Sequence, residues 1–249
     1  MIMFYFSATG NSKYIAESLC NTMNAACHSI EEKIDFTGLI APEDVIGFCY
    51  PIYGSRLPRL MREFVSMNEK SLKGKKLIIF CTQMIFSGDG SRVLTDLLPR
   101  DYAQVIYAEH FLMPNNVCNL FFLPVPGDKT IDWYLAKSQK KMQAVCENIS
   151  NGKVRKRGFN PGSRALGLVQ GVFLPGLEER AKKKVWISDD CDLCGLCVTI
   201  CPMENLAVES GKIVTSDNCM MCYRCINKCP KKALKVFLKG RVKKQYAGV

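Results

Sequence analysis

The stretch MIMFYFSATGNSKYIAESLCNTM, residues 1–23, joins an apolar run to a helical pattern through a short polar loop. Its first part, MIMFYF (1–6), predicts a buried strand, and SKYIAESLCNTM (12–23) predicts an amphipathic helix. A buried strand that turns tightly into an amphipathic helix is the opening unit of a parallel sheet covered by helices. The chain is therefore expected to begin with an α/β domain.

The same alternation continues to about residue 150. Further apolar runs predict strands at 27–30, 44–50, 75–82 and 103–111. Amphipathic segments predict helices at 57–68, 91–98 and 130–150. Five strands in this alternation predict an α/β fold with a doubly wound five-stranded parallel sheet over residues 1–150.

Beyond residue 150 the composition changes. The segment 151–164, NGKVRKRGFNPGSR, has the glycine, proline and basic residues of a linker, and an apolar stretch follows at 165–177. We treat 151–184 as a basic and apolar connector, 185–238 as a cysteine-rich domain and 239–249 as a basic tail. The tail is expected to have little order.

Charge and cysteine content narrow the class of protein. The net charge of +11 would suit nucleic acid, an anionic membrane surface or an acidic partner, but no nucleic-acid recognition motif accompanies it, so we expect no nucleic-acid binding. The opening residues lack the basic region and cleavage site of a signal peptide, and no apolar run reaches the ~18 residues of a membrane span. Of the 14 cysteines, eight stand in two tight arrays. This usage favours metal ligation in a reducing, cytoplasmic compartment over a disulfide framework.

The two arrays, CDLCGLCVTICP (191–202) and CMMCYRCINKCP (219–230), share the spacing C-x2-C-x2-C-x3-C-P. This is the ferredoxin spacing for 4Fe–4S clusters, in which the fourth cysteine of each array ligates the other cluster. It predicts cluster one at Cys191, Cys194, Cys197 and Cys229, and cluster two at Cys219, Cys222, Cys225 and Cys201. Structural zinc is the alternative, but zinc sites use four ligands from separated C-x2-C pairs. Eight cysteines filling eight ligand positions leave no iron open to substrate, which predicts an electron carrier.

The loop between the first strand and the first helix offers an anion site. Backbone N–H groups at a helix start, with hydroxyls beside them, can cradle a phosphate. The candidate residues are Ser7, Thr9, Gly10, Asn11 and Ser12. Neither G-x-x-x-x-G-K-[ST] nor G-x-G-x-x-G is present, which favours a flavin mononucleotide phosphate over a triphosphate. An ordinary capped helix is the alternative.

Two later loops are candidates for the ring of such a ligand. In a doubly wound sheet, ligands bind at the carboxyl ends of the strands. An aromatic side chain can stack on a flavin ring, and a neighbouring glycine lets the backbone approach it. The candidates are Pro51, Tyr53 and Gly54 after the third strand, and Thr82, Phe86, Ser87 and Gly88 after the fourth. The alternatives are a surface turn tyrosine at Tyr53 and a core plug at Phe86.

These motifs together resemble a known arrangement. FSATGNS (6–12) resembles the flavodoxin phosphate loop, PIYGSRLPR (51–59) resembles the second flavin loop of flavodoxin-like proteins, and the arrays resemble a bacterial two-cluster ferredoxin. The loop TQMIFSGDG (82–90) departs from short-chain flavodoxins. The whole chain resembles the flavodoxin-like/ferredoxin fusion proteins of anaerobic prokaryotes. The resemblance implies FMN, two 4Fe–4S clusters and a small α+β ferredoxin-like domain.

The expected function is electron transfer between the two clusters and FMN. A ferredoxin-type protein is the expected donor or acceptor, and reduced flavin could act on a small acceptor such as a quinone, a disulfide or a nitro compound. The alternative is a ferredoxin-type carrier whose amino-terminal domain and basic connector serve for docking to a partner or a membrane surface. His28 and His110 are the only histidines, and both are expected to be structural.

Overall fold

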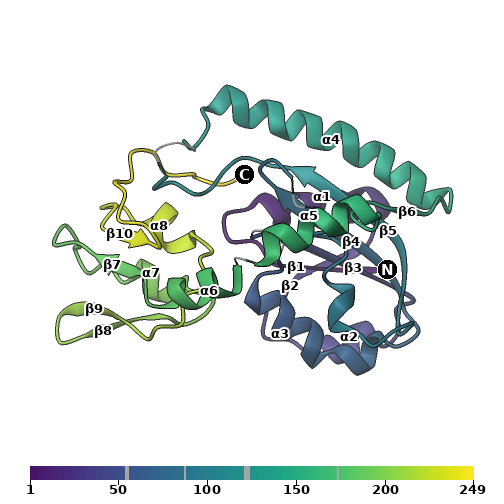
Figure 1. Ribbon diagram of the computed structural model, residues 1–249, viewed down its shortest axis with the longest axis horizontal. Coiled ribbons are helices and arrows are strands. Elements are labelled where there is room, and N and C mark those ends of the chain that lie inside the picture. Colours follow the sequence, from purple (N-terminus) through teal and green to yellow (C-terminus); the bar gives the residue numbers. More distant parts are fainter. Residues whose placement is uncertain (54–55, 87, 121–123, 173) are drawn as a thin grey trace.

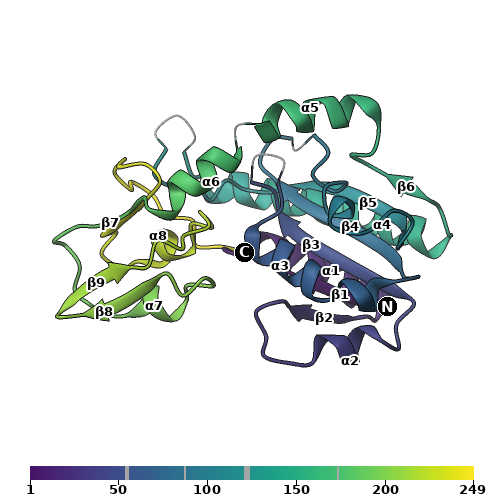
Figure 2. The same ribbon diagram turned by 60° about the horizontal axis from the view of Figure 1, so that its bottom comes forward.

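The computed structural model describes residues 1–53, 56–86, 88–120, 124–172 and 174–249, without the side chains of Leu174, Pro175 and Leu177. Figures 1 and 2 show a larger unit built on a twisted sheet and a smaller cysteine-rich unit beside it. The carboxyl-terminal end lies between the two units in both views.

The larger unit is a parallel sheet in the order β2-β1-β3-β4-β5-β6. Its strands are β1 (Ile2–Tyr5), β2 (Ala26–Ser29), β3 (Val45–Pro51), β4 (Lys76–Gln83), β5 (Gln104–Leu112) and β6 (Arg155–Lys156). All five pairings are parallel. The first five strands follow the order 2-1-3-4-5 of flavodoxin-like sheets, which confirms the predicted doubly wound fold. The sheet has six strands where the sequence predicted five.

Helices cover both faces of the sheet. Helices α1 (Asn11–Met23) and α4 (Asp128–Ser150) pack on one face, while α2 (Phe36–Ile40) and α3 (Arg59–Met67) pack on the other. Each face has its own apolar core, because strand side chains alternate between the two sides. A short 3₁₀ segment, η1 (Glu69–Leu72), follows α3.

The prediction of an α-helix at residues 91–98 is wrong. This segment forms turns and a single 3₁₀ segment, η2 (Thr95–Leu97). Its backbone bonds span three residues, such as Thr95 N–H to Arg92 O at 2.8 Å. Pro99 follows directly, and the residue before a proline avoids helical geometry, so the segment has no room to continue as an α-helix.

The sixth strand comes from the segment predicted as linker. Its neighbour β5 carries Glu109, whose side chain is only 1% exposed. Arg155 and Arg157 reach this carboxylate at 3.1 and 3.5 Å, and Lys141 of α4 reaches it at 2.9 Å. Burial alone would raise the pKa of Glu109, but Lys141, the His110 N–H and Arg155 outweigh it and lower the pKa below its ordinary value. The basic residues that resembled a linker therefore hold β6 against the sheet.

The rest of the connector is helical. It forms α5 (Pro161–Val172) and α6 (Leu174–Lys182). Gly167 and Gly171 face inward on α5, whereas Leu168, Val169 and Val172 are at least 64% exposed. None of the helices in the described part of the chain is long and apolar enough to cross a bilayer.

The smaller unit is an α+β domain with two short antiparallel sheets of two strands each. Strand β7 (Val185–Ile187) pairs antiparallel with β10 (Leu234–Val236), and β8 (Leu206–Glu209) pairs antiparallel with β9 (Lys212–Thr215). The one-turn helices α7 (Leu196–Thr199) and α8 (Arg224–Lys228) contact each other. The two halves are pseudo-symmetric: the N–H of Asn205 donates to the Cys201 sulfur, and the N–H of Ala233 donates to the Cys229 sulfur.

The basic tail is ordered, contrary to the expectation from its sequence. Val242 and Tyr246 are at most 5% exposed. The Gln245 amide donates to two carbonyls of the small domain, and the Tyr246 hydroxyl donates to Asn11 Oδ1 at 2.6 Å. Two apolar anchors four residues apart, embedded among lysines, were too weak a pattern to reveal this packing.

The buried His110 should make stability depend on pH. Its imidazole is hydrogen-bonded to the Ser91 hydroxyl at 2.8 Å, and burial, followed by the charge of Arg157, lowers its pKa to about 4. The unfolded chain takes up this proton near pH 6.5, so stability should fall as pH drops from 6.5 toward 4, by up to ~3 kcal/mol. Urea unfolding of the holoprotein at pH 7, 6 and 5 measures this slope. His110→Gln should flatten it, and an unchanged slope in that variant would assign the effect to other groups.

Candidate functional site

A hollow at the carboxyl end of the sheet lies where the loops after four strands converge. It encloses about 720 Å³ of space, counting its open mouth. Its walls come from residues 7–9, 11–12, 51–53, 82–84 and 113–117, together with Met221 and Tyr223. The loops after β1 and β3 meet here at the switch point of the sheet, where open α/β sheets bind their ligands.

The loop after β1 has the shape of an anion cradle. Gly10 takes a φ of +101°, a conformation that favours glycine, and α1 begins at the next residue. The backbone N–H groups of Ala8 and Thr9 have no acceptor within the described part of the chain. Side chains fix the loop around them: Ser7 Oγ accepts from Gly10 N, and Ser12 Oγ lies 2.8 Å from Thr82 Oγ1. Free donors at the amino end of a helix suit a phosphate.

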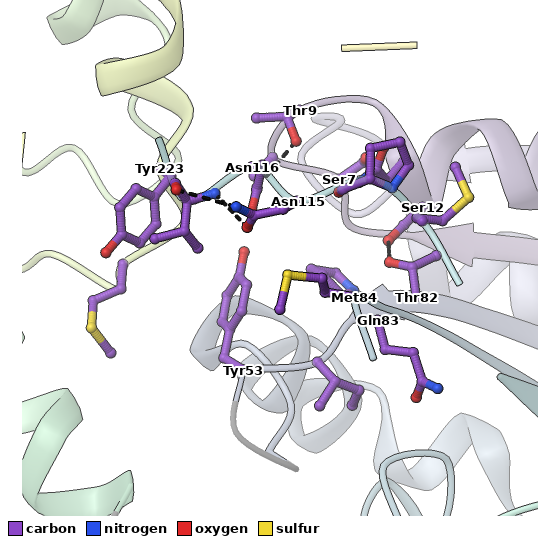
Figure 3. A pocket seen from close by; sticks show the side chains of 18 residues that line it. Ser7, Thr9, Ser12, Tyr53, Thr82, Gln83, Met84, Asn115, Asn116 and Tyr223 are labelled. Carbon is purple, nitrogen blue, oxygen red and sulfur yellow. Dashed lines mark hydrogen bonds between the residues drawn. The ribbon is translucent and has the colours of Figure 1, made fainter. Parts of the chain in front are cut away.

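Figure 3 shows the side chains that line the pocket. Tyr53 and Tyr223 lie toward the small domain, and the hydrogen-bonded pair Ser12 and Thr82 lies toward the sheet. The Tyr53 hydroxyl and Gln83 Oε1 are buried without a hydrogen-bond partner among the described residues. Burial, followed by the nearby Cys222 sulfur, raises the pKa of Tyr53, so its hydroxyl stays a donor. Unpaired donors and acceptors between apolar walls fit a bound flavin, which offers both an apolar ring and polar edges.

The structure brings most of the predicted flavin residues together. Those that line the pocket are Ser7, Thr9, Asn11, Ser12, Pro51, Tyr53 and Thr82. Gly10 shapes the loop without lining the hollow. Gly54 and Ser87 lie outside the described residues.

Phe86 and Gly88 are not part of this pocket. Phe86 is 54% exposed, and Gly88 packs against Gly167 of α5. Their loop turns away because Asp89 accepts the backbone N–H groups of Arg92 and Val93 through its carbonyl and binds the Arg92 side chain. Neither the core plug nor the ring contact considered for Phe86 describes its position.

Two sets of lining residues were missed. The segment 113–117 follows β5 at the same edge of the sheet, and its sequence MPNNV could have been included by the rule that ligands bind at strand ends. Asn116 Nδ2 donates to Thr9 Oγ1 and so braces the phosphate loop. Met221 and Tyr223 come from the small domain, and no local pattern indicated that they line this pocket.

The first predicted cluster site is assembled across the two arrays. Cys191, Cys194, Cys197 and Cys229 all line one hollow of about 340 Å³, closed by apolar residues that include Leu234 and Ile213. Burial, followed by the charges of Cys191, Cys229 and Cys194, raises the pKa of the Cys197 thiol. Cysteines ligate iron as thiolates, so bound iron would have to supply the charge that stabilises this form.

The second predicted set is also gathered. Burial, followed by the nearby sulfurs of Cys222, Cys219 and Cys201, raises the pKa of the Cys225 thiol. Burial raises the pKa of Cys222 to about 12 and also raises that of Cys219. Cys201 comes from the first array, so the fourth cysteine of each array lies with the first three of the other.

The chemistry of these donors fits clusters better than zinc. Four cysteines around an open hollow leave space for a larger group. The N–H donors to the sulfurs of Cys201, Cys219 and Cys229 are of the kind that tunes iron–sulfur sites.

The position after the second cysteine distinguishes the two arrays. The residue after the second cysteine has a left-handed backbone in both: Gly195, with φ of +73°, and Tyr223, with φ of +62°. Glycine adopts this conformation freely, whereas a bulky side chain does so at a cost of ~1 kcal/mol or more. The strained tyrosine is the one that faces the flavin pocket. Its position suggests that the aromatic ring is required there.

Two protein-family models match the chain. A family model described as a flavodoxin domain matches residues 2–160, and one described as a 4Fe-4S dicluster domain matches residues 183–230. No curated protein sequence matches the chain.

Several solved flavodoxins are similar to the larger domain. A flavodoxin from the domain Archaea is 14% identical, with 60% of this chain and 97% of that chain covered and a TM-score of 0.40. The two-electron reduced flavodoxin of Megasphaera elsdenii is 20% identical, with 57% and 99% covered and a TM-score of 0.40. Flavodoxin 1 of Bacillus cereus is 16% identical, with 57% and 96% covered and a TM-score of 0.36. On the family models, this chain belongs to the flavodoxin-domain family and carries a 4Fe-4S dicluster domain after it, which makes it an iron–sulfur flavoprotein electron carrier.

Proposed function

We propose that the chain relays electrons between two 4Fe–4S clusters and FMN. The observation that carries this proposal is that Met221 and Tyr223, on either side of Cys222, line the flavin pocket. A residue of the second cluster site and the wall of the flavin site are therefore adjacent in sequence and in space. Such an arrangement needs no second chain to bring the two centres together.

The residues present suit both cofactors. The phosphate loop 7–12 would hold the FMN phosphate, and Tyr53, Met221 and Tyr223 would flank its ring. The eight array cysteines would hold two clusters in the crossed sets given above. When bound, FMN exchanges one or two electrons and each cluster exchanges one.

The protein keeps water away from the space between these sites. Cys222 and Tyr223 are at most 8% exposed, and Met220 packs with Cys222 in the core of the larger domain. Burial, followed by the charges of Cys118 and Cys219, raises the pKa of Tyr223 well above its ordinary value, so its hydroxyl remains protonated. A dry, rigid contact of this kind lowers the reorganisation that accompanies a change of charge.

The first cluster site is the outer one. Cys194 is exposed, and Leu193 and Leu196 beside it are 42% and 39% exposed. We therefore propose that a ferredoxin-type partner approaches the chain at the loop of cluster one, and that a small acceptor such as a quinone, disulfide or nitro compound meets the flavin. We also propose a reducing, cytoplasmic setting, because eight of the 14 cysteines stand in the two arrays, where they would serve as cluster ligands.

Anaerobic reconstitution and titration with dithionite test the proposal. We expect about eight iron atoms and one FMN per chain, and bleaching of both flavin and cluster absorbance during the titration. A protein that takes up iron but binds no flavin at any pH would rule out the relay.

A further inference from the structure

One arginine of the second array joins the small domain to the phosphate loop. Arg224 lies between Cys222 and Cys225 in sequence, and its side chain reaches across to the larger domain. Nε donates to Ala8 O at 3.1 Å, and Nη2 donates to Ser7 O at 2.9 Å. Nη1 donates to Ile200 O at 3.0 Å, next to the cluster-two ligand Cys201.

The remaining donors of this guanidinium go to a single carboxylate. Nη1 and Nη2 each lie 2.6 Å from an oxygen of Glu31, which follows β2. A guanidinium has five N–H donors, and these contacts use all of them. The group also lies 5.8 Å from the centre of the Phe6 ring. Its position is therefore fixed from several directions, as expected for a bidentate arginine.

These contacts set the direction in which the phosphate loop presents its donors. In a planar trans peptide, the carbonyl of one residue and the N–H of the next point in opposite directions. With the carbonyls of Ser7 and Ala8 held by Arg224, the N–H groups of Ala8 and Thr9 point away from it. Both N–H groups lack an acceptor within the described residues, and both residues line the pocket.

The pseudo-symmetry of the small domain shows that this arginine is not needed to bind a cluster. The equivalent position in the first array is Leu196, which is 39% exposed. The site for cluster one is gathered without such a residue. The role of Arg224 is therefore explained by its contacts with the flavin domain and not by cluster binding.

We propose that Arg224 is a positioning residue for the FMN phosphate: it orients the peptides of the phosphate loop so that their N–H groups face the ligand. The docked ferredoxin domain thereby completes the flavin site of the same chain. This inference rests on the proposed function, because it requires that the pocket binds FMN.

The test compares FMN with riboflavin, which has the same ring and lacks the phosphate. Both affinities are measured anaerobically by flavin fluorescence quenching on iron-loaded protein. Arg224→Gln should weaken FMN binding by roughly tenfold or more, because the loss of charge-assisted bonds to two carbonyls frees the loop. Riboflavin binding should change by less than about twofold, since the ring walls remain in place.

Arg59→Gln provides the matched control. Arg59 of α3 also bonds across the domains, to the carbonyl and side chain of Asn218 at 2.6 and 2.9 Å, without touching the phosphate loop. It should keep the wild-type preference for FMN over riboflavin. If Arg224→Gln fails to load iron, Glu31→Gln loosens the same guanidinium from outside the array and should lower the preference for FMN in the same direction.

The possible failures are distinguishable. Equal loss of FMN and riboflavin affinity in Arg224→Gln would show a general structural role and overturn the inference. Unchanged FMN affinity in Arg224→Gln would overturn it as well. If wild-type protein binds neither flavin, the proposed function itself fails.

Discussion

Replacing Cys194 and Cys229 together by alanine should remove about four of eight iron atoms, whereas replacing Cys222 and Cys229 together should remove nearly all of them. The first pair belongs to one cluster site, because both cysteines line the same hollow although they lie in different arrays. The second pair lies in one array but serves both sites. Iron and acid-labile sulfide analysis of anaerobically purified protein measures the difference.

The opposite result would follow if each array held its own cluster. Cys222 and Cys229 would then share a cluster and their joint loss would spare half of the iron, while loss of Cys194 and Cys229 would affect both clusters. That outcome would contradict the crossed ligand sets. Cys146→Ala is the control, because Cys146 is buried on α4 outside both arrays and should leave the iron content unchanged. Flavin content shows in each variant whether the larger domain has folded.

Glu109→Leu should lower the free energy of unfolding by about 1–3 kcal/mol, less than the loss of a partner costs a fully buried charge, because the cations left behind are 31–50% exposed to solvent. The carboxylate is 1% exposed and lies within 3.5 Å of Lys141, Arg155 and Arg157. Leucine fills similar space but leaves these cations facing one another at the edge of the sheet. Since Arg155 lies in β6 and Arg157 follows it, we also expect this strand to detach.

Urea unfolding of the holoprotein at pH 7 measures the loss, and hydrogen exchange at residues 155–157 reports on the strand. Glu17→Gln is the matched control: Glu17 pairs with Lys13 at 3.7 Å on the surface of α1, where both side chains are about half exposed. Its loss should cost less than ~1 kcal/mol. A loss below 1 kcal/mol in Glu109→Leu would show that the buried carboxylate does not hold the strand.

The same network explains why the sixth strand could not be predicted. Strand signals in a sequence come from apolar or alternating residues, and the segment around Arg155 and Lys156 is uniformly basic. Its partner Glu109 stands 46 positions earlier in the chain, inside an otherwise apolar strand, so only the folded sheet brings the charges together. The five longer strands were predicted because their apolar runs are local.

In the candidate site, too, the residues that depend on local spacing were predicted, and those that depend on contacts distant in sequence were not. The phosphate loop and the crossed cysteine sets depend on local spacing, and the structure gathers the residues that the sequence singled out. Phe86 was wrongly assigned to the flavin site. The sequence pattern of an aromatic residue near a glycine is the same whether the side chain contacts a ligand or faces solvent. Tyr223 was missed because its role depends on how the two domains dock, and docking follows from contacts such as Arg224 with the phosphate loop.

The central claim is that flavin and clusters exchange electrons within one chain, and a kinetic measurement tests it most directly. A substoichiometric pulse of electrons from photoexcited deazaflavin is given to the reconstituted protein under anaerobic conditions, while absorbance is followed at flavin and cluster wavelengths. The account predicts that electrons redistribute between the two centres at a rate that stays constant over a tenfold range of protein concentration. A rate that rises in proportion to protein concentration would contradict it, because the transfer would then occur between chains.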